Sequence, residues 1–260
     1  VEVPVEFSSQ KKKTTTDKTG RWMIKLDAMK ANIQGQELKV TTVGSSVILK
    51  DILVGEVWLA SGQSNMGFSI SKSTHAEEAR KLIPHPTLRR FKVGSYIATK
   101  PLVDIGEDGA FQHPHWRMGD VGKWRTVDNE RHGLDWISAV AAWFGHEVRI
   151  SQGVPVGIIE SHFGGSKLYC WMPRESLENS PEFTRDIIEP YRDQKKKWDD
   201  AYAAWQHDPN RDPNRPPTEP WKLSCLYNAM IAPVTPYAMR GVIWYQGESN
   251  QGRAEAYRRQ

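Results

Sequence analysis

Gly-Glu-Val-Trp-Leu-Ala-Ser-Gly-Gln-Ser-Asn-Met, residues 55–66, is the stretch of sequence that decides the fold. Its first half contains a continuous apolar run, Val57-Trp58-Leu59-Ala60, which is typical of a strand that is covered on both faces. Its second half is polar and contains a glycine, as expected of the loop that leaves such a strand. The stretch therefore predicts a buried strand followed by an exposed turn.

Two later stretches repeat this pattern. Residues 156–159 form an apolar run before the polar segment 161–166, and residues 241–245 do so before 246–250. Helical patterns between the runs indicate strand–helix–strand units around a mostly parallel sheet. Because such sheets bind ligands at the carboxyl ends of their strands, we expect the three polar segments to converge on one site.

Two helical regions are predicted between these strands. Apolar residues recur at three- and four-residue steps from Trp136 to Val148, which indicates an amphipathic helix. Residues 176–207 are charged, aromatic and helix-prone, and the proline-rich residues 208–220 cannot continue a helix. We predict that 176–220 is an insertion over the core, either at the rim of a binding cleft or as a structural flap.

Residues 1–50 follow a different pattern, in which apolar and polar residues alternate. This period of two predicts short antiparallel strands, at residues 1–7, 22–26 and 38–42. Turn residues at 17–20 and 34–35 separate them. We predict part of a β-sandwich accessory domain over 1–50 and an α/β domain over 51–260. Since Val1 already lies in a strand pattern and is not a methionine, we expect upstream sequence to be missing.

The composition is that of a globular protein. The chain has 260 residues, of which 38% are hydrophobic, and a net charge of +4. Apart from two lysine triplets, at 11–13 and 195–197, its basic residues are scattered, so we expect no nucleic-acid partner. No apolar run approaches the ~20 residues of a membrane span. The two cysteines, Cys170 and Cys225, fit either one disulfide or two buried thiols.

The three polar segments carry the residue types of acyl transfer, which needs a nucleophile, a base and donors for the oxyanion. Ser64 follows a strand, Gly165 lets its N–H approach a substrate closely, and Gln246 offers a side-chain amide. Alone, Ser64 would be a helix cap, Gly164-Gly165 a tight turn and Gln246 an ordinary polar residue. Their joint placement after three strands favours a catalytic site.

Two of these segments resemble a known family. Residues 55–66 and Trp-Tyr-Gln-Gly-Glu-Ser-Asn at 244–250 are similar to the hallmark blocks of sialate O-acetylesterase-type SGNH hydrolases, and acetylxylan esterases share shorter versions. The similarity extends to Gly164-Gly165 and to residues 226–233. It implies a three-layer α/β/α, flavodoxin-like SGNH-hydrolase fold over 51–260, incomplete at its C-terminus. It also implies a serine esterase that needs no metal or organic cofactor.

The resemblance also implies roles for single residues. Ser64 corresponds to the nucleophile, and the N–H groups of Ser64 and Gly165 together with Gln246 correspond to the oxyanion hole. Glu248 matches a family acid, for which orienting loop amides or the Ser64 turn is favoured over proton transfer. Other members of the three blocks are expected to support the site or to contact substrate: Gln63, Asn65, Gly164, Glu248 and His162. The Gly-x-Ser-x-Gly elbow of α/β-hydrolases is absent around Ser64.

The base of the triad is not evident. In this family it lies in an Asp-x-x-His segment after the third block, and none of the eight histidines has that pattern, so we expect it beyond Gln260. His162 is a substitute base, a substrate contact or a loop-packing residue. His113 and His115 are close enough to suggest a metal site, but no third ligand joins them in an ordered motif. We therefore expect loop residues near the cleft there, and no metal.

The sequence thus predicts hydrolysis of acetyl esters on sugars such as sialic acid or xylan. A catalytically inactive carbohydrate-binding protein of the same fold is the alternative. A lipase or thioesterase is disfavoured because the segments around Ser64 and Gly165 are polar. Phe163 and Trp171 are expected to line the pocket, and the sequence does not tell which of these sugars they would select. The family's usual glycan substrates imply a secreted or periplasmic protein, and the oligomeric state stays open.

Overall fold

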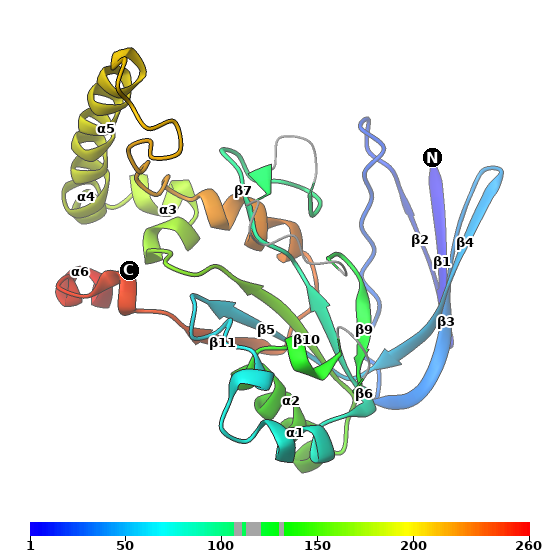
Figure 1. The fold of residues 1–260 in the computed structure, drawn as a ribbon. Helices are drawn as coiled ribbons and strands as arrows, with labels where there is room; N and C mark the ends of the chain where they lie inside the picture. The colour runs from blue at the N-terminus through cyan, green and yellow to red at the C-terminus, as the bar shows by residue number, and fades with distance from the viewer. Residues whose placement is uncertain (107–110, 113–120, 130–132) are drawn as a thin grey trace.

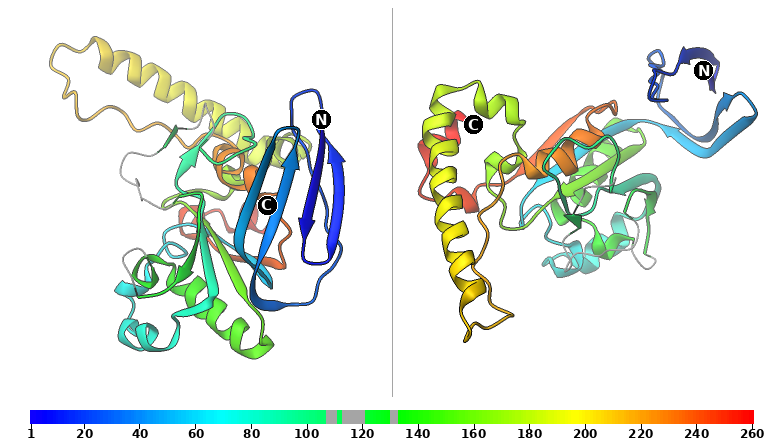
Figure 2. Two further views of the ribbon diagram at one scale, coloured as in Figure 1. Left: turned by 90° about the vertical axis from the view of Figure 1, so that its right-hand side faces the viewer. Right: turned by 90° about the horizontal axis from the view of Figure 1, so that it is seen from above.

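A computed structural model describes residues 1–106, 111–112, 121–129 and 133–260 (Figure 1). It contains a four-stranded sheet, a five-stranded sheet and a small two-stranded sheet of β7 (Tyr96–Ile97) and β8 (Phe111–Gln112). Figure 2 shows the four-stranded sheet beside the α/β part of the molecule, which is built around the five-stranded sheet.

The five-stranded sheet has the strand order β11-β5-β10-β6-β9. Its strands are β5 (Glu56–Gly62), β6 (His85–Lys92), β9 (Trp124–Val127), β10 (Val156–His162) and β11 (Gly241–Tyr245). β9 runs antiparallel to β6, and all other neighbours in the sheet are parallel. The mostly parallel sheet and its three predicted strands are confirmed.

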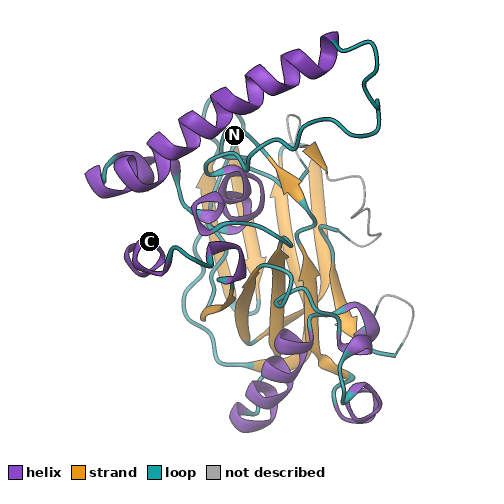
Figure 3. Ribbon diagram, turned by 60° about the vertical axis from the view of Figure 1, so that its left-hand side comes forward, coloured by secondary structure: helices purple, strands orange, loops and turns teal. Residues whose placement is uncertain are grey.

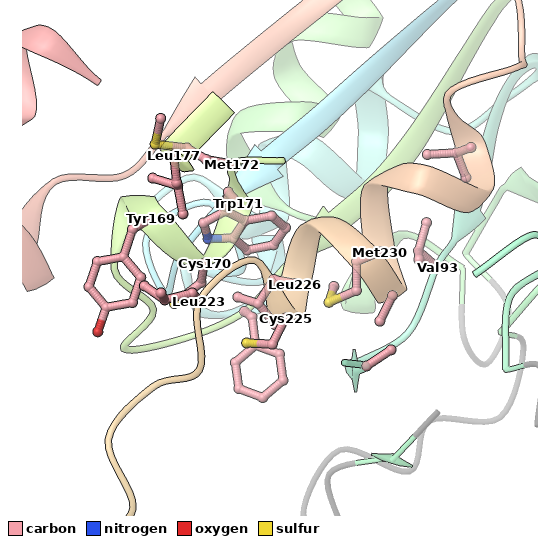
Figure 4. Packing of buried hydrophobic residues seen from close by; sticks show 14 of the residues in the cluster. Val93, Tyr169, Cys170, Trp171, Met172, Leu177, Leu223, Cys225, Leu226 and Met230 are labelled. Carbon is pink, nitrogen blue, oxygen red and sulfur yellow. The ribbon is translucent and has the colours of Figure 1, made fainter. Parts of the chain in front are cut away.

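Helices and short helical turns cover both faces of this sheet. One face carries η1 (Ile70–Lys72), α1 (Ala76–Leu82), η3 (Leu134–Trp136) and α2 (Ala139–Gln152), and its core includes Met66, Leu88 and Ile158. The other carries η4 (Leu168–Trp171), α3 (Arg174–Glu178), η5 (Thr184–Ile188), η6 (Tyr227–Ile231) and η7 (Ala232–Val234). Figure 4 shows the side chains packed on this second face. The three-layer α/β/α architecture is confirmed.

Helix α2 is the amphipathic helix that the apolar steps predict, although its start differs. Its N-cap is Ser138, whose side chain accepts a hydrogen bond from Ala141 N, and it ends at Gly153 in the left-handed conformation. Trp136 therefore lies outside the helix, in the preceding η3 turn. The hydroxyl of this N-cap also lies 3.5 Å from Met66 Sδ.

Strand β11 departs from the expectation of cover on both faces. It is an edge strand, and its residues Val242, Trp244 and Tyr245 are exposed among the residues that the structure describes. It pairs with β5 on one side, and its Ile243 packs against the core cluster that contains Met66 and Ile158.

The N-terminal sheet has the order β2-β1-β3-β4. Its strands are β1 (Glu2–Phe7), β2 (Gln10–Thr15), β3 (Asn32–Thr42) and β4 (Ser45–Val54), and all pairs are antiparallel. β4 runs through the predicted domain boundary after residue 50 and is separated from β5 by Gly55 alone. A Cβ on Gly55 would collide with the carbonyl oxygen of Pro155, so the two sheets meet at a close backbone contact.

The predicted strand at Trp22–Leu26 is wrong, because the segment forms no strand. Its neighbours along β2 bind it with side chains in place of a backbone ladder: Lys12 Nζ donates to Lys25 O over 3.1 Å, and Gln10 Nε2 donates to Asp27 O over 3.1 Å. The predicted turn at Gln34-Gly35 is wrong too. These residues lie inside β3, where the register with β4 shifts.

Residues 181–220, within the segment predicted to be an insertion, form an arm. After α4 (Pro181–Phe183) the chain makes α5 (Glu189–His207), in which no residue is buried, and returns through the extended 208–220 segment. Figure 3 shows α5 as the long helix that lies away from the strands. The helix part and the proline-rich return are both confirmed.

Aromatic stacking within the arm takes the place of a core. Trp198 stacks on Tyr202 at 5.0 Å and Tyr202 on Trp205 at 5.5 Å, with Lys195 Nζ 4.6 Å above the Trp198 ring. Trp198 Nε1 also donates to Pro217 O in the return segment over 2.9 Å. Since these aromatic rings stack on one another, their faces are covered within the arm. This geometry favours the structural flap over the rim of a binding cleft.

Cys170 and Cys225 are two buried free thiols. Of the two predicted alternatives, one disulfide or two buried thiols, the structure therefore shows the second. Burial raises the pKa of the Cys170 thiol well above its ordinary value, and the neighbouring Cys225 adds to the shift. Both belong to the core in Figure 4.

Candidate active site

The carboxyl ends of three strands are in register, and this alignment builds the site. In the pairing of β10 with β5, His162 lies opposite Gly62, and in the pairing of β11 with β5, Tyr245 lies opposite the same residue. The three polar segments therefore leave the sheet side by side, as the sequence predicts. Residues 182 positions apart in the chain, from Ser64 to Gln246, start from the same edge.

Ser64 lies in a tight turn directly after β5. Gly67 N donates to Gln63 O over 3.0 Å and closes the turn, while Gln63 N donates to Tyr245 O over 2.9 Å and ties it to β11. Met66 points into the core and is 1% exposed, whereas Ser64 is exposed. The buried methionine anchors the turn so that the serine hydroxyl faces solvent.

Glycine is required where the turn begins. Gly62 has φ +141°, a conformation that side chains rarely adopt, and a Cβ there would collide with the backbone of Tyr245. The missing side chain lets β5 and β11 approach each other at their ends, which sets the separation of the first and third loops.

The second loop brings Gly164 close to the serine. Phe163 N donates to Gly62 O over 3.0 Å, and a Cβ built on Gly164 would lie 3.7 Å from Ser64 Cβ. Gly165 follows with φ +71° and is exposed. Within the described residues, no hydrogen bond uses the N–H of Ser64 or of Gly165. Both amides are thus free to bind an anionic oxygen.

The third loop is tied to the serine turn by two side chains. Asn65 Nδ2 donates to Glu248 Oε1, and Gln63 Oε1 lies 3.4 Å from both Gly247 N and Ser249 N, which donate to it. Glu248 thus acts on the residue next to Ser64. This is the geometry expected of an acid that orients the turn.

Gln246 is already fully engaged as a donor. Its Nε2 donates to Ser166 O over 3.0 Å and to Asn250 Oδ1 over 2.8 Å, which uses both of its hydrogens. Asn250 in turn accepts from Leu168 N over 3.1 Å. The predicted oxyanion contact from Gln246 would require one of these bonds to break, and in this structure its amide joins the second and third loops.

Behind the loops lies a buried charge cluster that the sequence did not lead us to expect. The Glu160 side chain is fully buried, with Arg90 Nη1 3.6 Å from its Oε2 and His162 Nε2 3.8 Å from its Oε1. Burial alone would raise the pKa of this carboxyl, but His162, Arg90 and Lys92 outweigh it and lower the pKa to about 2. The available signal was a single acid directly after the apolar run 156–159, where the strand continues to His162.

Other predicted site residues lie elsewhere. Phe163 and Trp171 belong to the core, where Phe163 meets the Trp221 ring edge-on at 5.1 Å and Trp171 Nε1 donates to Ser166 Oγ over 2.9 Å. His113 and His115 fall outside the described residues. In the described part of the chain, no three His, Cys, Asp or Glu side chains group as metal ligands.

One cavity of the structure lies away from the serine. A cavity of about 290 Å³ lies at the amino ends of β5 and β10, lined by residues that include Arg89, Trp124 and Tyr237. Since the serine leaves the carboxyl end of β5, this cavity lies at the other end of the sheet. Across the residues that the structure describes, every helix is too short or too polar to traverse a bilayer.

The three-layer fold is shared with a solved carbohydrate acetylesterase. The chain is 28% identical to a carbohydrate acetylesterase from Xanthomonas citri, whose crystal structure superposes with a TM-score of 0.70 over 99% of this chain and 47% of that one. No protein-family model matches.

Curated proteins with a similar sequence are sialate O-acetylesterases. The chain is 31% identical over 255 residues to sialate O-acetylesterase of Mus musculus and 29% identical over 247 residues to that of Homo sapiens, each alignment covering 92% of this chain. It spans 44% of the mouse protein and 40% of the human one. The chain is a homologue of the sialate O-acetylesterases.

Proposed function

We propose that this protein is a serine esterase that releases acetyl groups from sugar hydroxyls, with Ser64 as the nucleophile. The observation that carries the proposal is the approach of the serine turn to the glycine loop, where Ser64 Cβ lies 3.7 Å from a Cβ position on Gly164. Exposure of Ser64 and Gly165 at this point leaves room for a substrate. The names of its homologues support the same class of ester.

In the proposed reaction, Ser64 Oγ attacks the acetyl carbonyl carbon, and the carbonyl oxygen becomes an oxyanion. The free N–H groups of Ser64 and Gly165 donate to it, and each such donor typically accounts for a factor of about 10²–10³ in rate. The sugar oxygen leaves with a proton, and water then hydrolyses the acetyl-serine. The turn is held for this step by the bond between Asn65 and Glu248.

The reaction also needs a base that takes the serine proton. By the family resemblance we propose the histidine of an Asp-x-x-His segment, a pattern that the 260 residues of this chain do not contain. As substrate we propose an O-acetylated sialic acid first, because the curated relatives are named for it, and acetylated xylan second. Such glycans also imply that the protein acts outside the cytoplasm.

The test is acetate release by the natural protein from a panel of acetylated sialic acids and polysaccharides. Ser64→Ala should lower the rate by a factor of about 10³ or more, because the nucleophile is lost while the binding surface remains. Ser176→Ala, an exposed serine on α3, is the matched control and should keep the wild-type rate.

Two outcomes would contradict the proposal. Acetate release by Ser64→Ala at the wild-type rate would exclude Ser64 as the nucleophile. A wild-type protein that binds the acetylated glycans without releasing acetate would favour the alternative of a catalytically inactive carbohydrate-binding protein.

A further inference from the structure

The proposed chemistry gives no role to Glu160, although this acid is the most deeply buried charge near the site. Its side chain has no exposed surface, and it shares its core with the cations Arg90 and Lys92, which are 3% and 7% exposed. Burying charges is costly even when they are paired, and an apolar side chain at such a position is often as stable. The contacts of the Glu160 carboxylate therefore indicate why a charge is kept at this buried position.

One contact of Glu160 leads to the serine turn through the start of α2. Glu160 Oε1 accepts a hydrogen bond from Ser138 N over 2.8 Å, at the helix N-terminus, where a negative charge is favoured. Ser138 Oγ in turn lies 3.5 Å from Met66 Sδ, and Ala139 N donates to Phe68 O over 2.8 Å. The end of the serine turn is thus fastened to the residues that Glu160 holds.

A second contact reaches the turn through His162. The imidazole lies with Nε2 3.8 Å from Glu160 Oε1, and a Cβ built on Gly67 would be 2.6 Å from its Nδ1. The ring therefore fills the space beside Gly67, the residue whose N–H closes the turn around Ser64. Glu160 and Gly67 enclose the imidazole from two sides.

We propose that Glu160 is a positioning residue for Ser64: acting through Ser138 and His162, its carboxylate fixes the serine turn against the glycine loop. The inference rests on the proposed esterase function and deepens it. It matters for rate because a displacement of about 1 Å at a reacting group can cost a factor of about 10². His162 is then a packing element of the turn, which accounts for its place in the glycine block.

A control variant at Ser161, the residue next to Glu160, distinguishes a positioning role from a general effect on stability. Ser161 is equally buried on the same strand, but its Oγ donates to Met230 O over 2.9 Å, on the opposite face of the sheet. Ser161→Ala removes a buried hydrogen bond without touching the serine turn. It is the matched control for Glu160→Gln, which keeps the side-chain size and removes the charge.

Two measurements on the natural protein test the proposal. Amide hydrogen exchange reports the turn directly: Glu160→Gln should speed exchange at Gly67 N by about tenfold or more, whereas Ser161→Ala should leave it unchanged. Steady-state kinetics report the consequence. Glu160→Gln should lower kcat by a factor of about 10–100 with KM nearly constant, and Ser161→Ala should stay within about twofold of wild type.

The outcomes are distinguishable. Unchanged exchange at Gly67 in a folded Glu160→Gln protein, or equal effects of Glu160→Gln and Ser161→Ala, would overturn the positioning role. Should Glu160→Gln not fold, His162→Gln breaks one of the two routes and is judged by the same criteria. If the wild type releases no acetate, the proposed function fails, and exchange at Gly67 still decides whether Glu160 holds the turn.

Discussion

Replacing Glu160 with glutamine should destabilise the protein in a pH-dependent way. The carboxyl pKa falls from 4.5 to about 2 on folding, and at about 1.4 kcal/mol per unit this shift contributes about 3 kcal/mol to stability at neutral pH. Because the folded-state pKa is depressed, the contribution is complete above pH 4.5 and is lost as the pH falls toward 2. Glutamine cannot supply it at any pH, and it removes the negative charge that lies beside the buried Arg90 guanidinium.

Urea unfolding followed by tryptophan fluorescence, at steps from pH 7 to pH 3, measures this linkage. Wild type should exceed Glu160→Gln by about 3 kcal/mol at pH 7, and about 2 kcal/mol of that difference should disappear by pH 3. Glu175→Gln, at an exposed acid on α3, is the matched control. A gap between wild type and Glu160→Gln that stays constant with pH would refute a charged Glu160 as its source.

Three further predictions concern other parts of the chain. Gly62→Ala should destabilise the protein by more than about 3 kcal/mol in chemical unfolding, because its Cβ meets the Tyr245 backbone at φ +141°; an unchanged midpoint would contradict this close approach. Trp205→Ala should speed proteolysis of the 208–220 segment while acetate release stays at the wild-type rate, since the ring stacks only within the arm. Cys170 and Cys225 should resist iodoacetamide at pH 8 in the folded protein and react after unfolding; rapid native labelling would count against their burial.

Much of the sheet could be predicted because short continuous apolar runs that end in turn residues are consistent with buried strands. β5 and β10 meet that condition, and their neighbours fill both faces. The apolar pattern does not tell which strand ends at an edge, so the exposure of β11 was missed. It also does not tell whether an alternating segment finds a backbone partner, and at Trp22–Leu26 the side chains of Gln10 and Lys12 took that place.

The site was predictable to the level of loops and no further. Strand ends bring Ser64, Gly165 and Gln246 to one edge whatever their spacing in the chain. Which N–H groups remain available to a substrate depends on local geometry that the sequence does not show. Gln246 Nε2 donates both of its hydrogens to partners within the loops, Ser166 O and Asn250 Oδ1. The proposed link from Glu160 to the serine turn runs through Ser138, which lies 22 residues earlier in the chain. No periodic pattern in the sequence relates these two residues.

The single residue between β4 and β5 has a practical consequence. With Gly55 pressed against the Pro155 carbonyl, a force applied to the N-terminal sheet is transmitted directly to β5, the strand that ends two residues before Ser64. A tag, surface or fusion partner attached at Val1 would therefore transmit force to the turn that carries Ser64. The tip of the arm, beyond α5, is the mechanically isolated place to mount them.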